Sequence, residues 1–277
     1  MAEISLHVPT PPPKWFVRFA KAGLVAKGIV YCLVGLLAFM AAFEIGNSSS
    51  QSSSRSGVFR FVLEQPFGQI LLALIAVGLA CYTGWRILEA VNDTSHKGSG
   101  AKGIAARIGY LFSGLIYGGL AYSAGRLVLG GGGGSGGDMR QTFAREMLQQ
   151  PFGQWLVGAV ALGTIGMGVY QMYRGLSGKY KKKVRNAGLS SDIERTIIKA
   201  GKAGYVARGM VWMIIGYLLL QAALKANANE AGGSSRAFAW LESTAYGSIL
   251  LGVVALGLIC YGVFMFMRAK YQPIPPG

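Results

Sequence analysis

The fold is decided by the stretch Val25-Ala-Lys-Gly-Ile-Val-Tyr-Cys-Leu-Val-Gly-Leu-Leu-Ala-Phe39. Its pattern, a pair of small residues, then an aromatic residue and an apolar run, occurs three times in the chain. The second copy runs from Gly109 to Tyr117 and reads Gly-Tyr-Leu-Phe-Ser-Gly-Leu-Ile-Tyr. The third runs from Gly204 to Trp212 and reads Gly-Tyr-Val-Ala-Arg-Gly-Met-Val-Trp. A pattern that recurs in this way indicates internal structural repeats.

The composition is typical of a membrane protein. Of the 277 residues, 52% are hydrophobic and 14% are charged, whereas a soluble domain carries roughly 25% charged residues. Six apolar runs are each near or above the ~17–25 residues that cross a bilayer as a helix. We therefore predict an all-α, multi-pass membrane protein rather than a large soluble bundle. The predicted spans are 27–44, 66–88, 107–128, 151–174, 208–225 and 246–268.

These spans form three two-helix repeats, and a short amphipathic helix precedes the second span of each repeat. The even number of spans gives every repeat the same orientation, which predicts a pseudo-threefold arrangement about the membrane normal. We expect the short helices to lie on the outer face. The predicted repeats are 14–92, 103–178 and 192–270, between a disordered tail at 1–13 and a carboxy-terminal tail at 271–277.

The net charge of +16 is distributed unevenly. Only seven of the 27 Lys and Arg residues lie on the side of the predicted spans opposite the amino terminus. This positive-inside asymmetry predicts that both termini are cytoplasmic and that the protein lies in the inner membrane. It accounts for the basic charge without nucleic-acid binding. No cleavable signal peptide is apparent, so we expect the first span to remain as an anchor.

The repeated glycines are predicted to be helix-packing positions, because small residues let helix backbones approach closely in lipid. A hinge or a substrate contact is the alternative. The first spans carry Gly-x4-Gly and then an aromatic residue, and the second spans carry Gly-x3-Tyr. Repeat two needs about three extra residues before its second motif. The glycines are Gly23, Gly28, Gly109, Gly114, Gly204, Gly209, Gly78, Gly166 and Gly257.

These motifs, at Gly204–Trp212 and Pro66–Tyr82, resemble the bacterial domain of unknown function 1206, which comprises about three tandem two-helix units. The resemblance covers residues 15–270. Repeat two departs from it, since Ser113 stands where Lys27 and Arg208 stand in the other repeats. The resemblance implies a bacterial inner-membrane protein and supplies no activity.

The tyrosines of the second spans, Tyr82, Tyr170 and Tyr261, have two interpretations. They form either a polar constriction, with Arg86, Arg174 and Arg268 at its cytoplasmic mouth, or an aromatic belt at the headgroup level. The belt is favoured, because Tyr82 lies one helical turn from Arg86, which marks the end of the span.

A basic run follows the fourth span and includes Lys179, Lys181, Lys182, Lys183 and Arg185. Its residues could attract anionic lipid headgroups. The alternative, which we favour, is that they only determine topology.

No catalytic, metal or cofactor site is predicted. The cysteines Cys32, Cys81 and Cys260 fall inside spans without zinc or disulfide spacing, and His7 and His96 lie outside every span. No ionisable residue lies between the charges that bound each span, which argues against a proton-coupled pump. We therefore expect no enzymatic activity.

Two functions remain. The first, which we favour, is a non-enzymatic membrane scaffold or interaction protein. The second is a channel or carrier for a small solute or ion along the pseudo-threefold axis. The expected partners are membrane lipids, including anionic ones, while protein partners and oligomeric state are left open. A centre packed shut by side chains would favour the first function, and a hydroxyl-lined, water-filled path the second.

Overall fold

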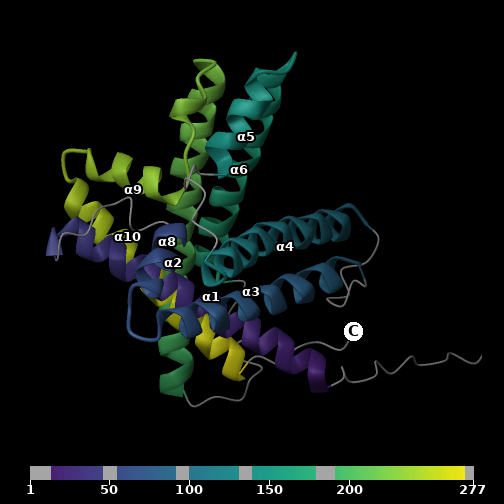
Figure 1. Ribbon diagram of the computed structural model, residues 1–277, viewed down its shortest axis with the longest axis vertical. Helices are drawn as coiled ribbons and strands as arrows, with labels where there is room; N and C mark the ends of the chain where they lie inside the picture. Colours follow the sequence, from purple (N-terminus) through teal and green to yellow (C-terminus); the bar gives the residue numbers. More distant parts are fainter. Residues whose placement is uncertain (1–13, 46–54, 92–99, 131–138, 179–190, 272–277) are drawn as a thin grey trace, which may run out of the picture.

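A computed structural model describes residues 14–45, 55–91, 100–130, 139–178 and 191–271 (Figure 1). The predicted tails lie outside these residues, except for Tyr271, which ends the last helix.

The described residues are almost entirely helical and contain no β-strand, which confirms the all-α class. Four minor elements precede the second helices: α2 (Arg55–Leu63), α5 (Met139–Leu148), the 3-10 turn η2 (Ala228–Glu230) and α9 (Ser234–Glu242). The long helices are α1 (Lys14–Ala42), α3 (Gly68–Val91), α4 (Ala101–Val128), α6 (Gly153–Leu176), α8 (Ser191–Leu224) and α10 (Gly247–Tyr271).

Five of the described helices, α1, α3, α6, α8 and α10, are long and apolar enough to cross a membrane. The chain is thus a multi-pass membrane protein by helix length and composition. The sixth long helix, α4, has 28 residues and is also long enough. Its glycine, serine and tyrosine residues lower its hydropathy, so the predicted span at 107–128 stays a prediction.

The first helix of each repeat is longer than the predicted span. Helix α1 begins at Lys14 and α8 begins at Ser191, so the segments before Lys27 and Arg208 are continuous with the predicted spans. Both cations therefore lie within their helices, and not at their ends as the span boundaries predicted. This difference positions the site described below.

The long helices pack in a nearly cyclic order. The second helix of each repeat packs against the first helix of the next, in the pairs α3–α4, α6–α8 and α10–α1. Within repeats one and three, α1 packs against α3 and α8 against α10. Figure 1 shows α1 and α10 crossing the molecule diagonally, while the α3–α4 and α6–α8 pairs diverge from them.

Repeat two is the exception, because extensive packing between α4 and α6 is absent from the described structure. A closed pseudo-threefold ring would need this sixth contact. The arrangement seen here is therefore a ring opened within one repeat.

The second helices align without the three extra residues predicted for repeat two. Helices α3 and α6 each contain 24 residues and begin at the glycine of Pro-Phe-Gly. The preceding phenylalanines have similar positive φ angles, 59° at Phe67 and 65° at Phe152. This register makes Gly163, and not Gly166, the counterpart of Gly78, and makes Met167, and not Tyr170, the counterpart of Tyr82.

Packing between repeats supports this register. A Cβ built at Gly168 of α6 would lie 2.8 Å from the carbonyl oxygen of Gly209 on α8. A Cβ at Gly262 of α10 would lie 2.7 Å from the carbonyl oxygen of Gly28 on α1. Gly168 and Gly262 occupy the same position when the helices are aligned from their first glycine. The two interfaces are therefore built alike.

Glycines also close the interface within repeats one and three. A Cβ built at Gly23 or at Gly204 would lie 2.6 Å from the Cα atom of Tyr82 or Tyr261, respectively. A Cβ at Gly78 would lie 2.5 Å from the Cβ atom of Ala26. Only glycine permits these approaches, so these residues act as packing positions.

The corresponding glycines of repeat two face open space. A Cβ built at Gly109, Gly163 or Gly166 would meet nothing within 4 Å. Phe112 also stands where Ala26 and Ala207 stand in the other repeats. A phenylalanine ring would prevent the close approach that the alanine methyl group allows, which gives a physical reason for the separation of α4 and α6.

Equivalent glycines in two repeats provide a matched test. We expect Gly204→Ala to lower the free energy of unfolding by about 1–3 kcal/mol, because its methyl group overlaps the backbone of Tyr261. Gly109→Ala should be neutral or slightly stabilising, because the site is open and alanine favours the helix. Thermal unfolding in detergent measures both. Equal losses in the two variants would contradict the difference between the repeats.

Candidate functional site

Charged residues predicted to mark the membrane surface lie inside the bundle. Lys27 is 3% exposed and Glu89 is 6% exposed. Sequence reasoning treated both charges as boundaries of the spans and did not predict this burial. Its physical reason is that the helices extend past the charges taken as span boundaries, and neighbouring helices cover them.

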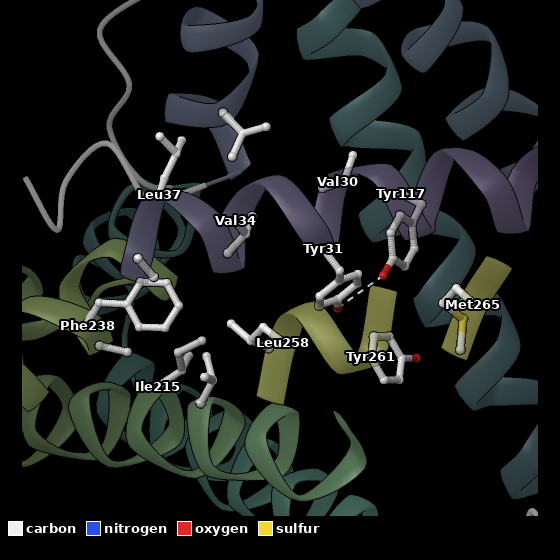
Figure 2. Close-up of a cluster of buried hydrophobic side chains, with 14 of the residues drawn as sticks. Val30, Tyr31, Val34, Leu37, Tyr117, Ile215, Phe238, Leu258, Tyr261 and Met265 are labelled. Carbon is white, nitrogen blue, oxygen red and sulfur yellow. Dashed lines mark hydrogen bonds between the residues drawn. The ribbon is translucent and has the colours of Figure 1, made fainter. Parts of the chain in front are cut away.

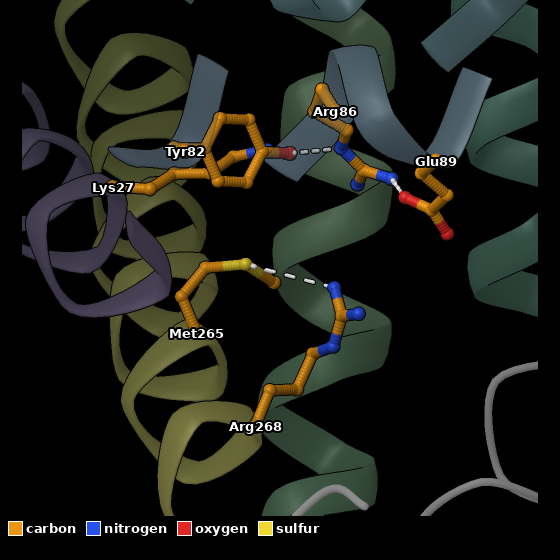
Figure 3. Close-up of polar contacts among 6 residues, drawn as sticks. All are labelled: Lys27, Tyr82, Arg86, Glu89, Met265 and Arg268. Carbon is orange, nitrogen blue, oxygen red and sulfur yellow. Dashed lines mark hydrogen bonds and ion pairs between the residues drawn. The ribbon is translucent and has the colours of Figure 1, made fainter. Parts of the chain in front are cut away.

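In repeat one, two cations share one tyrosine hydroxyl group (Figure 3). Lys27 Nζ on α1 and Arg86 Nε on α3 each donate to the hydroxyl oxygen of Tyr82 at 2.9 Å. Arg86 also donates through Nη1 to Glu89 Oε2 at 2.5 Å. The bond from Lys27 to Tyr82 links the two helices of the repeat.

Repeat three contains the same link. Arg208 on α8 donates through Nη1 to the hydroxyl oxygen of Tyr261 on α10 at 2.5 Å. Arg208 occupies the position of Lys27, and Tyr261 that of Tyr82. The Nε atom of Arg208 is buried without a hydrogen-bond partner. An unsatisfied buried donor is costly, so this atom offers a bond to a further acceptor.

Tyrosine rings fill the point where the repeats meet (Figure 2). Tyr31 on α1 lies 4.7 Å from Tyr261 on α10, and Tyr82 on α3 lies 4.7 Å from Tyr117 on α4, between ring centroids. Tyr117 donates to the hydroxyl oxygen of Tyr31 at 3.3 Å. Tyr205 on α8 packs edge-on against Tyr261 at 5.6 Å. Such edge-to-face contacts are favourable arrangements of aromatic rings.

Two further arginines approach this point. The guanidinium carbon of Arg174 on α6 lies 5.1 Å from the ring centroid of Tyr205, and that of Arg268 on α10 lies 5.9 Å from the centroid of Phe264. The Phe264 ring in turn lies 5.7 Å from that of Tyr205, between centroids, and the guanidinium carbon of Arg208 lies 5.0 Å from the centroid of Tyr261. Five long helices thus bring a basic side chain to one place: α1, α3, α6, α8 and α10.

We call this group the cation–tyrosine cluster. It comprises five cations, five tyrosines and one carboxylate: Lys27, Arg86, Arg174, Arg208, Arg268, Tyr31, Tyr82, Tyr117, Tyr205, Tyr261 and Glu89.

The cluster carries an excess of positive charge, since Glu89 is its one carboxylate among the described residues. Buried charge is costly unless it is paired. Tyrosine hydroxyl groups and ring faces offset part of this cost through hydrogen bonds and cation–π contacts. The guanidinium group of arginine can also donate two parallel hydrogen bonds to a carboxylate or phosphate group. The arrangement can therefore hold an anionic group.

The structure brings some predicted site residues together and separates others. Tyr82, Tyr261, Arg86, Arg174 and Arg268 meet in or beside the cluster. Tyr82 and Tyr261 are buried, and so lie inside the bundle rather than in a surface belt. Tyr170 is 54% exposed and is therefore not buried with the other two tyrosines.

The predicted lipid-contact residues lie outside the described part of the chain, at Lys179, Lys181, Lys182, Lys183 and Arg185. In the described part, no group of three or more His, Cys, Asp or Glu residues is arranged to hold a metal. The cysteines are free thiols.

Sequence reasoning missed Lys27, Arg208, Glu89 and Tyr205 as interior residues. The repeat alignment contained a signal for two of them. A long cation follows Gly23 and Gly204 at the same spacing, and each repeat with that cation also has a tyrosine four residues after the glycine of its second span. With α6 aligned from Gly153, repeat two lacks both features, because Ser113 and Met167 stand at these positions.

The shared hydroxyl group of Tyr82 can be tested by substitution. We expect Tyr82→Phe to lower the free energy of unfolding by about 1–3 kcal/mol, because two charged donors lose an acceptor. Adding Lys27→Met should cost less in this background than in the wild-type protein. Thermal unfolding of the two single variants and of the double variant measures these effects, with Tyr122→Phe on the exposed side of α4 as the control. Additive effects of the two substitutions would contradict the link.

Comparisons with known proteins agree with the threefold pattern. The family "Domain of Unknown Function (DUF1206)" matches the chain at residues 22–93, 108–178 and 203–272. The uncharacterized protein YxxB of Bacillus subtilis (strain 168) is 34% identical over 258 residues, covering 93% of this chain and 92% of that protein. No solved structure matches. The chain therefore belongs to the DUF1206 family and carries its unit three times in tandem.

Proposed function

We propose that this protein is a non-enzymatic, six-span protein of the bacterial inner membrane, with both termini in the cytoplasm, that binds an anionic group in the cation–tyrosine cluster. The observation that carries the proposal is the convergence of five cations from five helices, with a single carboxylate, that of Glu89, beside them among the described residues. A purely structural core would not need this excess of positive charge, because apolar side chains of similar volume pack at least as stably.

The donors of the cluster support an oxyanion as the ligand. Arg208 has a buried Nε donor without a partner. Arg174 approaches the face of Tyr205, a contact that holds the guanidinium carbon near the ring without using all of its five N–H donors. Bound anionic oxygen atoms would satisfy these donors and lower the repulsion between neighbouring guanidinium groups.

The closed packing of the tyrosines supports a binding or interaction protein more than an open channel. Tyr31, Tyr117 and Tyr261 are buried, and their rings and hydroxyl groups contact one another where the repeats meet. The interior thus contains hydroxyl groups, as expected for a solute path, but they bond to neighbouring side chains.

The contribution of α4 supports a sixth span. This helix packs along α3, with Gly114 against Arg86 and Gly118 against Thr83. It also supplies Tyr117 to the cluster. A helix that packs along one span and supplies a side chain to the shared cluster belongs at the same depth in the bilayer.

Anion-dependent stability tests this function. We expect phosphate or sulfate to raise the free energy of unfolding relative to chloride at equal ionic strength, by about 2.7 kcal/mol at a hundred times Kd. Arg208→Gln should abolish this increase, because it removes a charged donor from the cluster. Thermal unfolding of the purified protein in an uncharged detergent measures it.

Lys199→Gln is the matched control, since Lys199 lies on the same helix and is exposed. It should leave the anion effect intact. Equal stability in all anions, or a loss of the effect in Lys199→Gln, would contradict an anion site in the cluster.

A further inference from the structure

We propose that the anionic group is the phosphate headgroup of a membrane lipid, which reaches the cation–tyrosine cluster between α4 and α6. This inference rests on the proposed function and names its ligand. The region between these two helices is called the seam below, and its residues are Phe112 on α4 and Gly163 and Tyr170 on α6.

The positions that form the seam in repeat two are exposed, whereas the equivalent positions in the other two repeats are buried. Phe112 is 49% exposed, whereas its counterparts Ala26 and Ala207 are 4% and 5% exposed. Tyr170 is more than half exposed, whereas the aromatic residues at its position in α3 and α10 are buried. Both positions are therefore exposed only in repeat two.

The seam also lacks the bond that closes the other repeats. Ser113 replaces the long cation that Lys27 provides in repeat one, and Met167 replaces the tyrosine that Tyr82 provides. A serine hydroxyl group is too short to bridge the helices, and a thioether is a weak acceptor. Nothing equivalent to the cation–tyrosine link can therefore form between α4 and α6.

Two cations of the cluster flank the seam. Arg86 on α3 lies against α4, with its guanidinium carbon 5.0 Å from the ring centroid of Tyr110. Arg174 lies on α6 one helical turn after Tyr170, and its guanidinium carbon lies 5.1 Å from the ring centroid of Tyr205. Both arginines are partly exposed rather than fully enclosed. A negative charge between them would bind two guanidinium groups that otherwise repel each other.

A phosphate-bearing lipid fits both the two arginines and the apolar residues of the seam. Its phosphate can accept paired N–H bonds from arginine, and its acyl chains can lie against the apolar residues of the seam. The lipid already resides in the bilayer, so its phosphate can reach the arginines sideways. A soluble anion would have to pass the packed tyrosines or cross lipid. Charge and polarity therefore favour the lipid over a free phosphate ion.

Titration of the delipidated full chain in uncharged detergent tests the inference. The probes are dioctanoyl phosphatidylglycerol, dioctanoyl phosphatidylcholine and glycerol 3-phosphate. Phosphatidylcholine has acyl chains but no net negative charge, and glycerol 3-phosphate has a phosphate but no acyl chains. Binding is measured by calorimetry and by native mass spectrometry. We expect phosphatidylglycerol to bind about tenfold or more tightly than either other probe.

Variants on both halves of the surface sharpen the test. Arg174→Gln should weaken phosphatidylglycerol binding about tenfold, because charged hydrogen bonds are lost, and Arg174→Lys should retain part of it. Phe112→Asn should also weaken it, because it places a polar group against the acyl chains. Val77→Asn, at an exposed apolar position of α3 away from the seam, should not.

Each of the other possible results would contradict a specific part of the proposal. Equal binding of glycerol 3-phosphate and phosphatidylglycerol would leave the anion site standing and overturn the lipid. Equal binding of both lipids would overturn recognition of the anionic headgroup. Failure of all three probes to bind would overturn both the lipid and the anion site. The same conclusion would follow if Phe112→Asn and Val77→Asn weakened binding equally and Arg174→Gln had no effect.

Discussion

The hydrogen bond from a cation on the first helix of a repeat to a tyrosine on the second is the interaction on which this structure depends. It occurs as Lys27 to Tyr82 and as Arg208 to Tyr261. Glycines beside each tyrosine let the two backbones approach, and the bond then satisfies a charge that the approach has buried. Close packing and charge burial are therefore coupled, and repeat two has neither.

Much of the fold could be predicted from the sequence because it follows from local patterns. Apolar length determines the long helices, and threefold recurrence determines their grouping. The Pro-Phe-Gly segments mark the starts of α3 and α6. The register of α6 could not be read reliably, because glycines are frequent there and Gly166 and Tyr170 reproduce the expected spacing by chance.

The candidate site was harder to predict, because a charge at the end of an apolar run usually marks the membrane surface. That rule fails for Lys27 and Arg208, whose helices continue towards the amino terminus and are covered by neighbours. The contact between Arg174 and Tyr205 joins two repeats, and no spacing within either repeat encodes it. Tertiary packing alone brings such residues together.

The separation of α4 from α6 has a consequence for stoichiometry. Three identical repeats closed around an axis would present three equal entrances, or none, and a ligand would bind without a preferred orientation. Divergence of the middle repeat leaves a single side of the ring different from the others. With the ligand proposed above, one chain would offer one approach and accommodate one ligand in one orientation. The loss of internal symmetry is what gives such a site a direction within the plane of the membrane.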